Sequence, residues 1–217
     1  MSKYILPKET AKLLYKYFDA AQNLYGIAPL NKLLEIYNNQ NQPITEEQFL
    51  KFVDNMDLSN KFYDIIGVDE MYEDVPPVKP INRDIVAEYL YYPNTETYYK
   101  VKENQRIFSF YVPKKEKFLK YADEFYFEKT LEFISLRAFL RNQKYLTKEK
   151  ADEIAGELQF VARIENGNPD FIIQCAESMG VNLDNLNIYQ EFVDLFIDVD
   201  NNTRKHIYCG HTHNEVF

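Results

Sequence analysis

The chain has 217 residues, 46% of them hydrophobic, and a formal net charge of −9 at pH 7. Such a length and hydrophobic fraction exclude a wholly disordered chain and fit one large domain or two small ones. The acidic balance argues against nucleic acid as the main partner, because phosphate binding needs a basic face. We find no signal peptide, membrane-spanning apolar run or disulfide framework, so we expect a cytoplasmic protein with reduced thiols and no membrane partner.

The aromatic composition is unusual, with 18 Tyr, 16 Phe and no Trp. Tyrosine combines a large apolar ring with a polar hydroxyl, so it suits half-buried positions. We therefore expect most of these rings to pack in or just below the surface of the core rather than to form a binding surface.

Three helices are predicted at the start of the chain. Apolar residues recur at helical spacing over residues 8–25. Pro29 is suited to opening a second helix, where its missing N–H costs nothing, and the polar residues 38–43 form a loop by composition. Thr45 and Gln48 have the spacing of a capping box, which predicts the start of a third helix.

A strand-like pattern follows the third helix. Residues 61–66 are rich in aromatic and β-branched types, and 70–75 could return as a second strand of a hairpin. Three helices and then a hairpin are the order of a winged-helix domain. The proline segment 76–80 indicates a boundary, so we predict a winged-helix-like module over 1–77 and a helical domain over 78–217.

DNA binding through the third helix would be the usual function of a winged-helix module. The charges oppose it here: residues 1–77 hold seven Lys and twelve Asp or Glu, a net charge of −5. The third helix and its end carry Glu46, Glu47 and Asp54 against Lys51 alone. We therefore favour a module used for protein contacts or packing, with nucleic-acid association as the alternative.

The middle of the chain is less regular. We expect a short helix from Asn82, a hairpin formed by 98–101 and 107–112, and a long aromatic helix over 114–143 that breaks near Asp123.

Three glutamates, Glu124, Glu128 and Glu132, have helical spacing within that long segment. Such a ladder could bind a metal in a helical bundle, but di-metal bundles also use Glu-x-x-His elements. Every histidine of this chain lies at position 206 or later. We interpret the glutamates as a solvated helix face.

Three more helices are predicted before the tail. Thr147 caps the first, which runs to a turn at 166–169; the second covers 171–179, and the third begins near Asp184. Cys175 lies on an apolar helix face, so we interpret it as a small buried hydrophobe rather than a nucleophile. The fold class is thus mainly α with small β-hairpins (α+β).

The last seventeen residues, 201–217, hold all three histidines and one of the two cysteines. His206, Cys209, His211 and His213 are four candidate metal ligands within eight residues, and imidazole and thiolate are ligands that zinc prefers. Their spacing is not that of a recognised zinc site. A Cys209 nucleophile with a histidine base is a further alternative. We favour a polar, turn-rich tail folded against the helical domain, with His211 hydrogen-bonded inside it and no cofactor.

The tail also carries a sequence resemblance. The motif NNTR at 201–204 and the motif GHTHNE at 210–215 resemble the closing motif of a family of uncharacterised Gram-positive bacterial proteins. The resemblance extends to 24–40 and 121–143. Many members of that family continue into a SEC-C zinc-binding motif, whose cysteines do not occur here. Members tend to have proline at the position of His213, and Cys209 lies outside the family pattern.

The resemblance shifts the candidate site away from the four-ligand metal cluster. The residues it singles out are Asn202, Thr203, Arg204, Gly210, His211, Thr212, Asn214 and Glu215. On these grounds we expect a non-enzymatic protein-interaction or adaptor protein. The alternatives are a nucleic-acid-associated regulator or mobile-element accessory protein, and a metal-dependent enzyme sited at the C-terminal His/Cys cluster. The oligomeric state and the identity of the partner do not follow from the sequence.

Overall fold

The computed structural model describes residues 6–164 and 169–217. Its internal contacts divide the chain into two compact units, an N-terminal unit up to Tyr126 and a C-terminal unit from Phe127 to Phe217. The chain is mainly helical with one three-stranded antiparallel sheet among the described residues, which confirms the predicted mainly-α class. The sequence placed a boundary in the proline segment 76–80; the contacts divide the chain after Tyr126.

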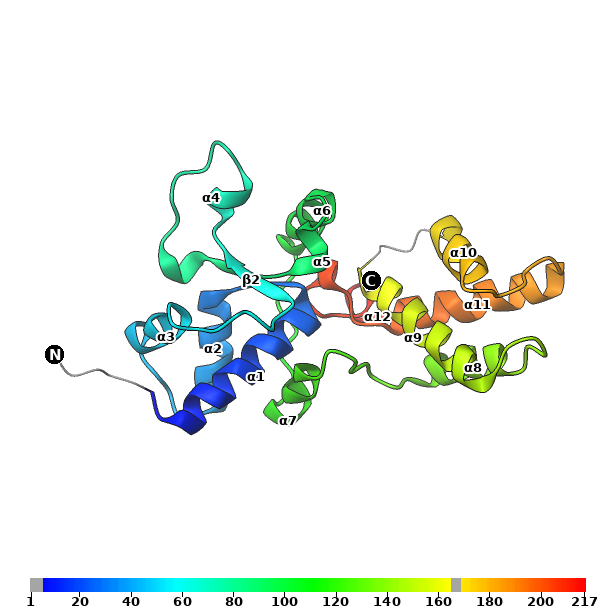
Figure 1. Ribbon diagram of the computed structural model, residues 1–217, viewed down its shortest axis with the longest axis horizontal. Helices are drawn as coiled ribbons and strands as arrows, with labels where there is room; N and C mark the ends of the chain where they lie inside the picture. Colours follow the sequence, from blue (N-terminus) through cyan, green and yellow to red (C-terminus); the bar gives the residue numbers. More distant parts are fainter. Residues whose placement is uncertain (1–5, 165–168) are drawn as a thin grey trace. The chain divides into compact units, whose positions relative to one another are not determined.

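The N-terminal unit contains the sheet and the helices around it (Figure 1). Strands β1 and β2 both pair antiparallel with β3, so β3 is central and the order is β1-β3-β2. The elements, in chain order, are α1 (Lys8–Tyr25), β1 (Ile27–Pro29), α2 (Leu30–Gln40), α3 (Glu46–Val53), β2 (Tyr63–Ile66), α4 (Val68–Met71), η1 (Pro80–Asn82), β3 (Asp84–Ala87), α5 (Glu88–Tyr91), α6 (Glu96–Gln105), α7 (Lys115–Phe118) and η2 (Leu119–Ala122).

The first three helices confirm the predictions from spacing and caps. Helix α1 covers the predicted residues, and Gly26 follows it with a φ of 67°, a conformation that costs glycine little. Helix α2 continues to Gln40, so the loop begins later than its composition indicated. The capping box of α3 is present: the Gln48 N–H donates to Thr45 Oγ1 at 3.2 Å, and the Thr45 N–H donates to Gln48 Oε1 at 2.9 Å.

The partner of β2 is not the one predicted. The predicted second strand at 70–75 is wrong, because α4 covers its start; β2 pairs instead with β3, where the sequence predicted a helix from Asn82. All four residues of β3 are buried, and a short apolar run buried on both faces has no periodicity that distinguishes strand from helix. The hairpin predicted from 98–101 and 107–112 is also wrong, because α6 covers the first of these segments.

The core of the N-terminal unit is built largely from aromatic rings, as the composition predicted. Tyr17 lies against Tyr37 with ring centroids 5.1 Å apart, and Phe18 stacks on Phe49 at 5.8 Å. Aromatic pairs add to area burial through their edge-to-face or offset geometry. Buried rings of the unit include Tyr17, Phe18, Tyr25, Tyr37, Phe49, Tyr63, Tyr98, Phe118 and Tyr121.

The C-terminal unit is a helical bundle in which α8 and α9 both contact α11, and α10 packs on α9 (Figure 1). Its buried core is richer in aliphatic side chains and alanine than the core of the N-terminal unit, including Leu136, Ala151, Ile154, Leu158 and Val199. The elements are α8 (Leu131–Arg141), α9 (Lys148–Ile164), α10 (Pro169–Ser178), α11 (Leu186–Asn202), η3 (His206–Tyr208) and α12 (His213–Val216).

The long helix predicted over 114–143 is wrong as a continuous element, although the break predicted near Asp123 is confirmed. Helical turns end at Ala122, and α8 begins only at Leu131, after Thr130 has accepted the Phe133 N–H at 3.2 Å as its cap. The predicted glutamate ladder is therefore wrong as well: Glu124 and Glu128 lie in the non-helical segment, so they share no helix face with the third glutamate.

The later helices follow the sequence closely. Thr147 Oγ1 accepts the Lys150 N–H at 3.1 Å, which confirms it as the cap of α9. The turn predicted at 166–169 falls mostly outside the described residues, which omit 165–168. Cys175 in α10 is half-buried rather than buried. Within the described ranges, no helix has the length and apolar character needed to cross a membrane.

Candidate functional site

The segment that follows α11 folds into a closed loop and a last short helix. Thr203 ends α11, and the Lys205 N–H donates to the His211 carbonyl at 3.0 Å, while the Gly210 N–H donates back to the Lys205 carbonyl at 3.0 Å. The chain reverses through two residues of positive φ, Cys209 at 51° and Gly210 at 83°. A left-handed cysteine is uncommon and carries a cost in strain, so the surrounding contacts must hold this turn.

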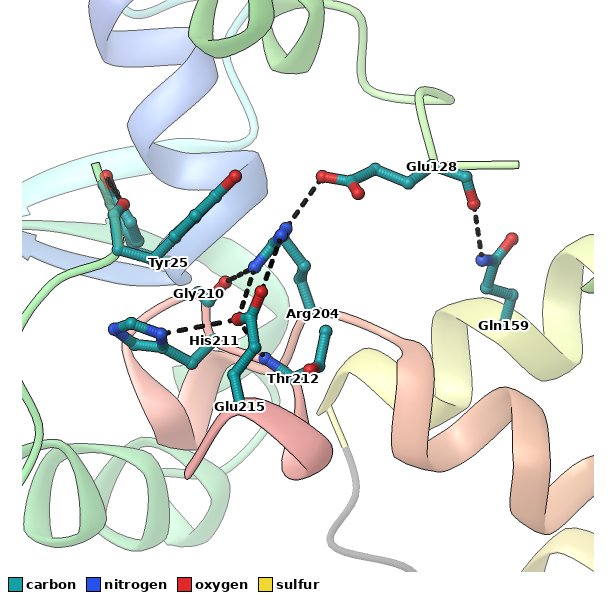
Figure 2. A network of polar contacts seen from close by, with 9 residues as sticks. Tyr25, Glu128, Gln159, Arg204, Gly210, His211, Thr212 and Glu215 are labelled. Atoms are coloured by element: carbon teal, nitrogen blue, oxygen red, sulfur yellow. Dashed lines mark hydrogen bonds and ion pairs between the residues drawn. The ribbon is translucent and has the colours of Figure 1, made fainter. Parts of the chain in front are cut away.

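Arg204 is the centre of these contacts (Figure 2). Its side chain is 8% exposed, and Nε donates to Glu128 Oε1 at 2.7 Å. Nη1 donates to the Gly210 carbonyl at 3.0 Å and to Glu215 Oε2 at 2.9 Å, and Nη2 donates to Glu215 Oε1 at 3.2 Å. The paired bonds to Glu215 are the two-pronged arrangement that a planar guanidinium forms with a carboxylate. One side chain thus joins the segment before α8, the turn and α12.

The protonation of this cluster follows from its geometry. Burial disfavours the charged guanidinium, but the hydrogen bonds that it donates to Glu215 and Glu128 outweigh this effect and raise the pKa of Arg204 above its ordinary value. Burial likewise acts to raise the pKa of Glu215, yet the bonds from Arg204 and from the Thr212 N–H lower it on balance. The two groups therefore stay ionised together at neutral pH.

Glu215 also receives contacts from its own turn. The Thr212 N–H donates to Glu215 Oε2 at 3.1 Å, and His211 Nδ1 lies 3.4 Å from the same oxygen. Figure 2 shows the carboxylate between the imidazole, the Thr212 amide and the guanidinium. This single acceptor orients three neighbours, which fixes the start of α12.

Lys205 is a second buried cation, which the sequence interpretation missed. Its side chain is 1% exposed, and Nζ donates to Asp200 Oδ1 at 2.6 Å and to the Ala162 carbonyl at 2.9 Å. Ala162 lies in the last turn of α9, where carbonyls lack an intrahelical donor and the helix dipole favours a positive charge. Lys205 thus joins the segment 203–217 to α9, and Arg204 joins the same segment to Glu128. An Asp five positions before a Lys at the end of a predicted helix was the available signal.

The remaining residues of the motif make local contacts. Thr203 Oγ1 donates to the Val199 carbonyl at 2.7 Å, and the Asn214 amide donates to Asn202 Oδ1 at 3.3 Å. Together with Arg204, they join α11, the turn and α12. The structure therefore brings all the residues of the motif into one contiguous cluster.

The four candidate metal ligands lie in different surroundings. His206 and Cys209 are buried, whereas His211 faces Glu215 and His213 lies against Phe217, with ring centroids 4.8 Å apart and ring planes tilted by 33°. Among the residues that the structure describes, no three His, Cys, Asp or Glu side chains are grouped so as to hold a metal ion.

A pocket of about 480 Å³ opens beside this segment, within the C-terminal unit. Its volume lies in the range of ligand-binding pockets. Buried Phe192 and Phe196 contribute to it, and Ile197 and Phe217 are exposed. Tyr208 lies against Phe217 with ring centroids 5.8 Å apart. The lining residues are Ile172, Ile173, Phe192, Val193, Phe196, Ile197, Asp200, Asn201, Tyr208, His213 and Phe217.

The charged cluster and the pocket are therefore structurally linked through the segment 203–217. Arg204 and Lys205 hold the segment 203–217, and that segment supplies Tyr208, His213 and Phe217 to the pocket wall. Comparison with protein-family models, curated proteins and solved structures gave no match.

Proposed function

We propose that this is a non-enzymatic interaction protein whose C-terminal unit binds a partner polypeptide in the pocket lined by α10, α11 and the C-terminal segment. The observation that carries the proposal is the pocket itself, which is mostly apolar and has exposed isoleucine and phenylalanine at its edge. Exposed apolar surface of this kind is where partner side chains gain most from burial.

The C-terminal cluster supports a binding role rather than chemistry. The charges of Arg204 and Lys205 are matched by carboxylates within the unit, so their bonds serve to hold the pocket wall. In this proposal the residues of the motif are positioning residues. They act on the partner through Tyr208, His213 and Phe217.

We further propose that the N-terminal unit contains a winged-helix-like module. The element order α1-β1-α2-α3-β2-α4-η1-β3 and the sheet order β1-β3-β2 support it, with the short α4 and η1 in the connection between β2 and β3. The surface of α3 favours a protein partner over nucleic acid: Glu46 and Glu47 are exposed, and Lys51 is paired with Glu47 at 2.6 Å. Phosphates would be repelled by this face.

Site-directed photocrosslinking tests the pocket proposal. A benzoylphenylalanine probe replaces Ile197, which is 46% exposed at the pocket, or Ile134, which is 43% exposed on α8 and does not line it. In an extract of the source cells we expect the probe at Ile197 to crosslink a polypeptide and the probe at Ile134 to give little. Equal crosslinking from both sites, or none from Ile197, would contradict the proposal.

A further inference from the structure

Beyond the pocket, one face of α11 forms a mainly apolar stripe of Leu186, Val193 and Ile197, which is interrupted by the exposed polar side chain of Gln190. Val193 and Ile197 line the pocket one helical turn apart, and Leu186 lies on the same face two turns before Val193 and is exposed. From Leu186 to Ile197 the stripe spans about 16 Å at a rise of 1.5 Å per residue. Three turns of helix have this length. The surface therefore matches the apolar edge of a partner helix with anchors at i, i+4, i+7 and i+11.

The groove formed by the pocket and this stripe has only acidic charged side chains, and no Lys or Arg, on the two helices that form its walls, α10 and α11. From Pro169 to Asn202, which covers α10 and α11, the sequence holds seven Asp or Glu and no Lys or Arg. Asp194 and Asp198 are exposed and directly follow the groove residues Val193 and Ile197 in α11. Asp200 is neutralised by Lys205 inside the unit, so the rim charge comes chiefly from the exposed acids.

We propose that the occupant of the groove is a basic amphipathic helix of a partner protein, an inference that rests on the proposed function and names its partner class. Its apolar face would cover Val193 and Ile197, and its Lys or Arg residues would face Asp194 and Asp198. Complementary charge of this kind sets specificity and raises the association rate.

Other occupants fit the charge less well. A second copy would bring the same acidic rim against itself if it paired through α11, and like charges across an interface are unfavourable. A membrane with anionic headgroups would be repelled in the same way. Phe217, exposed at the end of the pocket, gives the partner helix an aromatic contact at its terminus.

The test uses the full chain and three fluorescent peptides of roughly 18 residues, long enough to form a helix. The first has Leu at i, i+4, i+7 and i+11 with Lys elsewhere on its polar face. The second keeps the Leu positions and replaces Lys by Glu, and the third has the composition of the first with the Leu positions shuffled. We expect the first to bind with a Kd on the order of 10 μM and the others at least about tenfold more weakly, by fluorescence anisotropy.

Variants locate the binding. Ile197→Glu should weaken the basic peptide at least about tenfold, because a charge enters the apolar contact, whereas the matched Ile134→Glu on α8 should leave it unchanged. Asp194→Asn with Asp198→Asn should weaken it about three- to tenfold and flatten its dependence on salt. Circular dichroism of each variant checks that the fold is kept.

Three results would overturn the inference: equal binding of the Glu peptide or the shuffled peptide, an affinity unaffected by the two Asn substitutions, or a dimer in sedimentation that Ile197→Glu dissociates. If no peptide binds but the Ile197 probe still crosslinks a polypeptide, the basic helix is wrong and the interaction function stands. If both fail, both proposals fall.

Discussion

The two units hold the segments outside their long helices mainly by different kinds of hydrogen bond. In the N-terminal unit, neutral donors of α1 and α2 bind the backbone of 111–123: Tyr25 Oη donates to the Tyr111 carbonyl at 2.7 Å, and the Gln40 amide donates to the Pro113 carbonyl at 2.8 Å. In the C-terminal unit, segment 203–217 is held by two buried cations, Arg204 and Lys205. Neutral bonds contribute about equally at any pH, whereas charge-assisted bonds contribute more each and depend on ionisation.

Replacing the central cation should give the largest effect. Arg204→Leu removes the guanidinium that donates to both Glu128 and Glu215, and we expect the C-terminal unit to lose about 3 kcal/mol of unfolding free energy. Urea unfolding combined with hydrogen exchange assigns the loss to 127–217. Arg141→Leu is the matched control, because Arg141 pairs with Asp152 at the surface and should cost less than about 1 kcal/mol. A similar loss from both variants would contradict the central role of Arg204.

Removing a neutral hydrogen bond that holds 111–123 in the N-terminal unit should lower the free energy of unfolding by a smaller amount. This decrease should not change with pH. The Asn23 amide donates to the Tyr121 carbonyl at 3.0 Å and the Asp123 carbonyl at 2.8 Å, so Asn23→Leu should cost about 2 kcal/mol. Asn55→Leu removes an exposed bond to the Lys51 carbonyl and should cost less than about 0.5 kcal/mol. Unfolding at pH 5 and pH 7 measures both, and a loss for Asn23→Leu that changed with pH would erase the contrast.

The smallest expected effect is the contribution of the Glu215 carboxylate to the pH dependence of the free energy of unfolding. The pKa of Glu215 is lowered from its ordinary value of 4.5, so its stabilisation is present above that pH and is lost as the pH falls through the folded-state pKa. Glu215→Gln should cost about 1 kcal/mol at pH 6, since the carboxylate is 40% exposed, and the difference should shrink near pH 3. Thermal unfolding from pH 3 to pH 6 measures this. A constant difference, or the same profile for the exposed control Glu157→Gln, would contradict it.

The predictions that succeeded used information local to the sequence. The capping box of Thr45 and Gln48 and the cap at Thr147 depend on side chains and amides within four residues, so their spacing was sufficient. The prediction failed at β3 and α6. For β3 the reason is that its pairing with β1 and β2 and the burial of all four of its residues depend on elements outside the local sequence. Periodicity does not contain that information.

The candidate site divides in the same way. The motif around Arg204, Gly210 and Glu215 could be singled out in advance, and these residues contact one another across at most eleven positions. Glu128 could not be singled out in this way. It lies 76 positions before Arg204 in the sequence, and its spacing assigned it to a solvated helix face. Its carboxylate reaches the guanidinium only because the predicted long helix is interrupted.

The sequence by itself determined the mainly helical class, most helix starts and the compact polar tail, since these follow from caps, spacing and composition. Only the tertiary structure decided the partner of each buried charge and the presence of the apolar pocket. An ion pair between distant segments and a pocket lined by α10, α11 and the tail depend on how whole elements pack, and packing distributes its free energy over contacts that no local stretch of sequence contains.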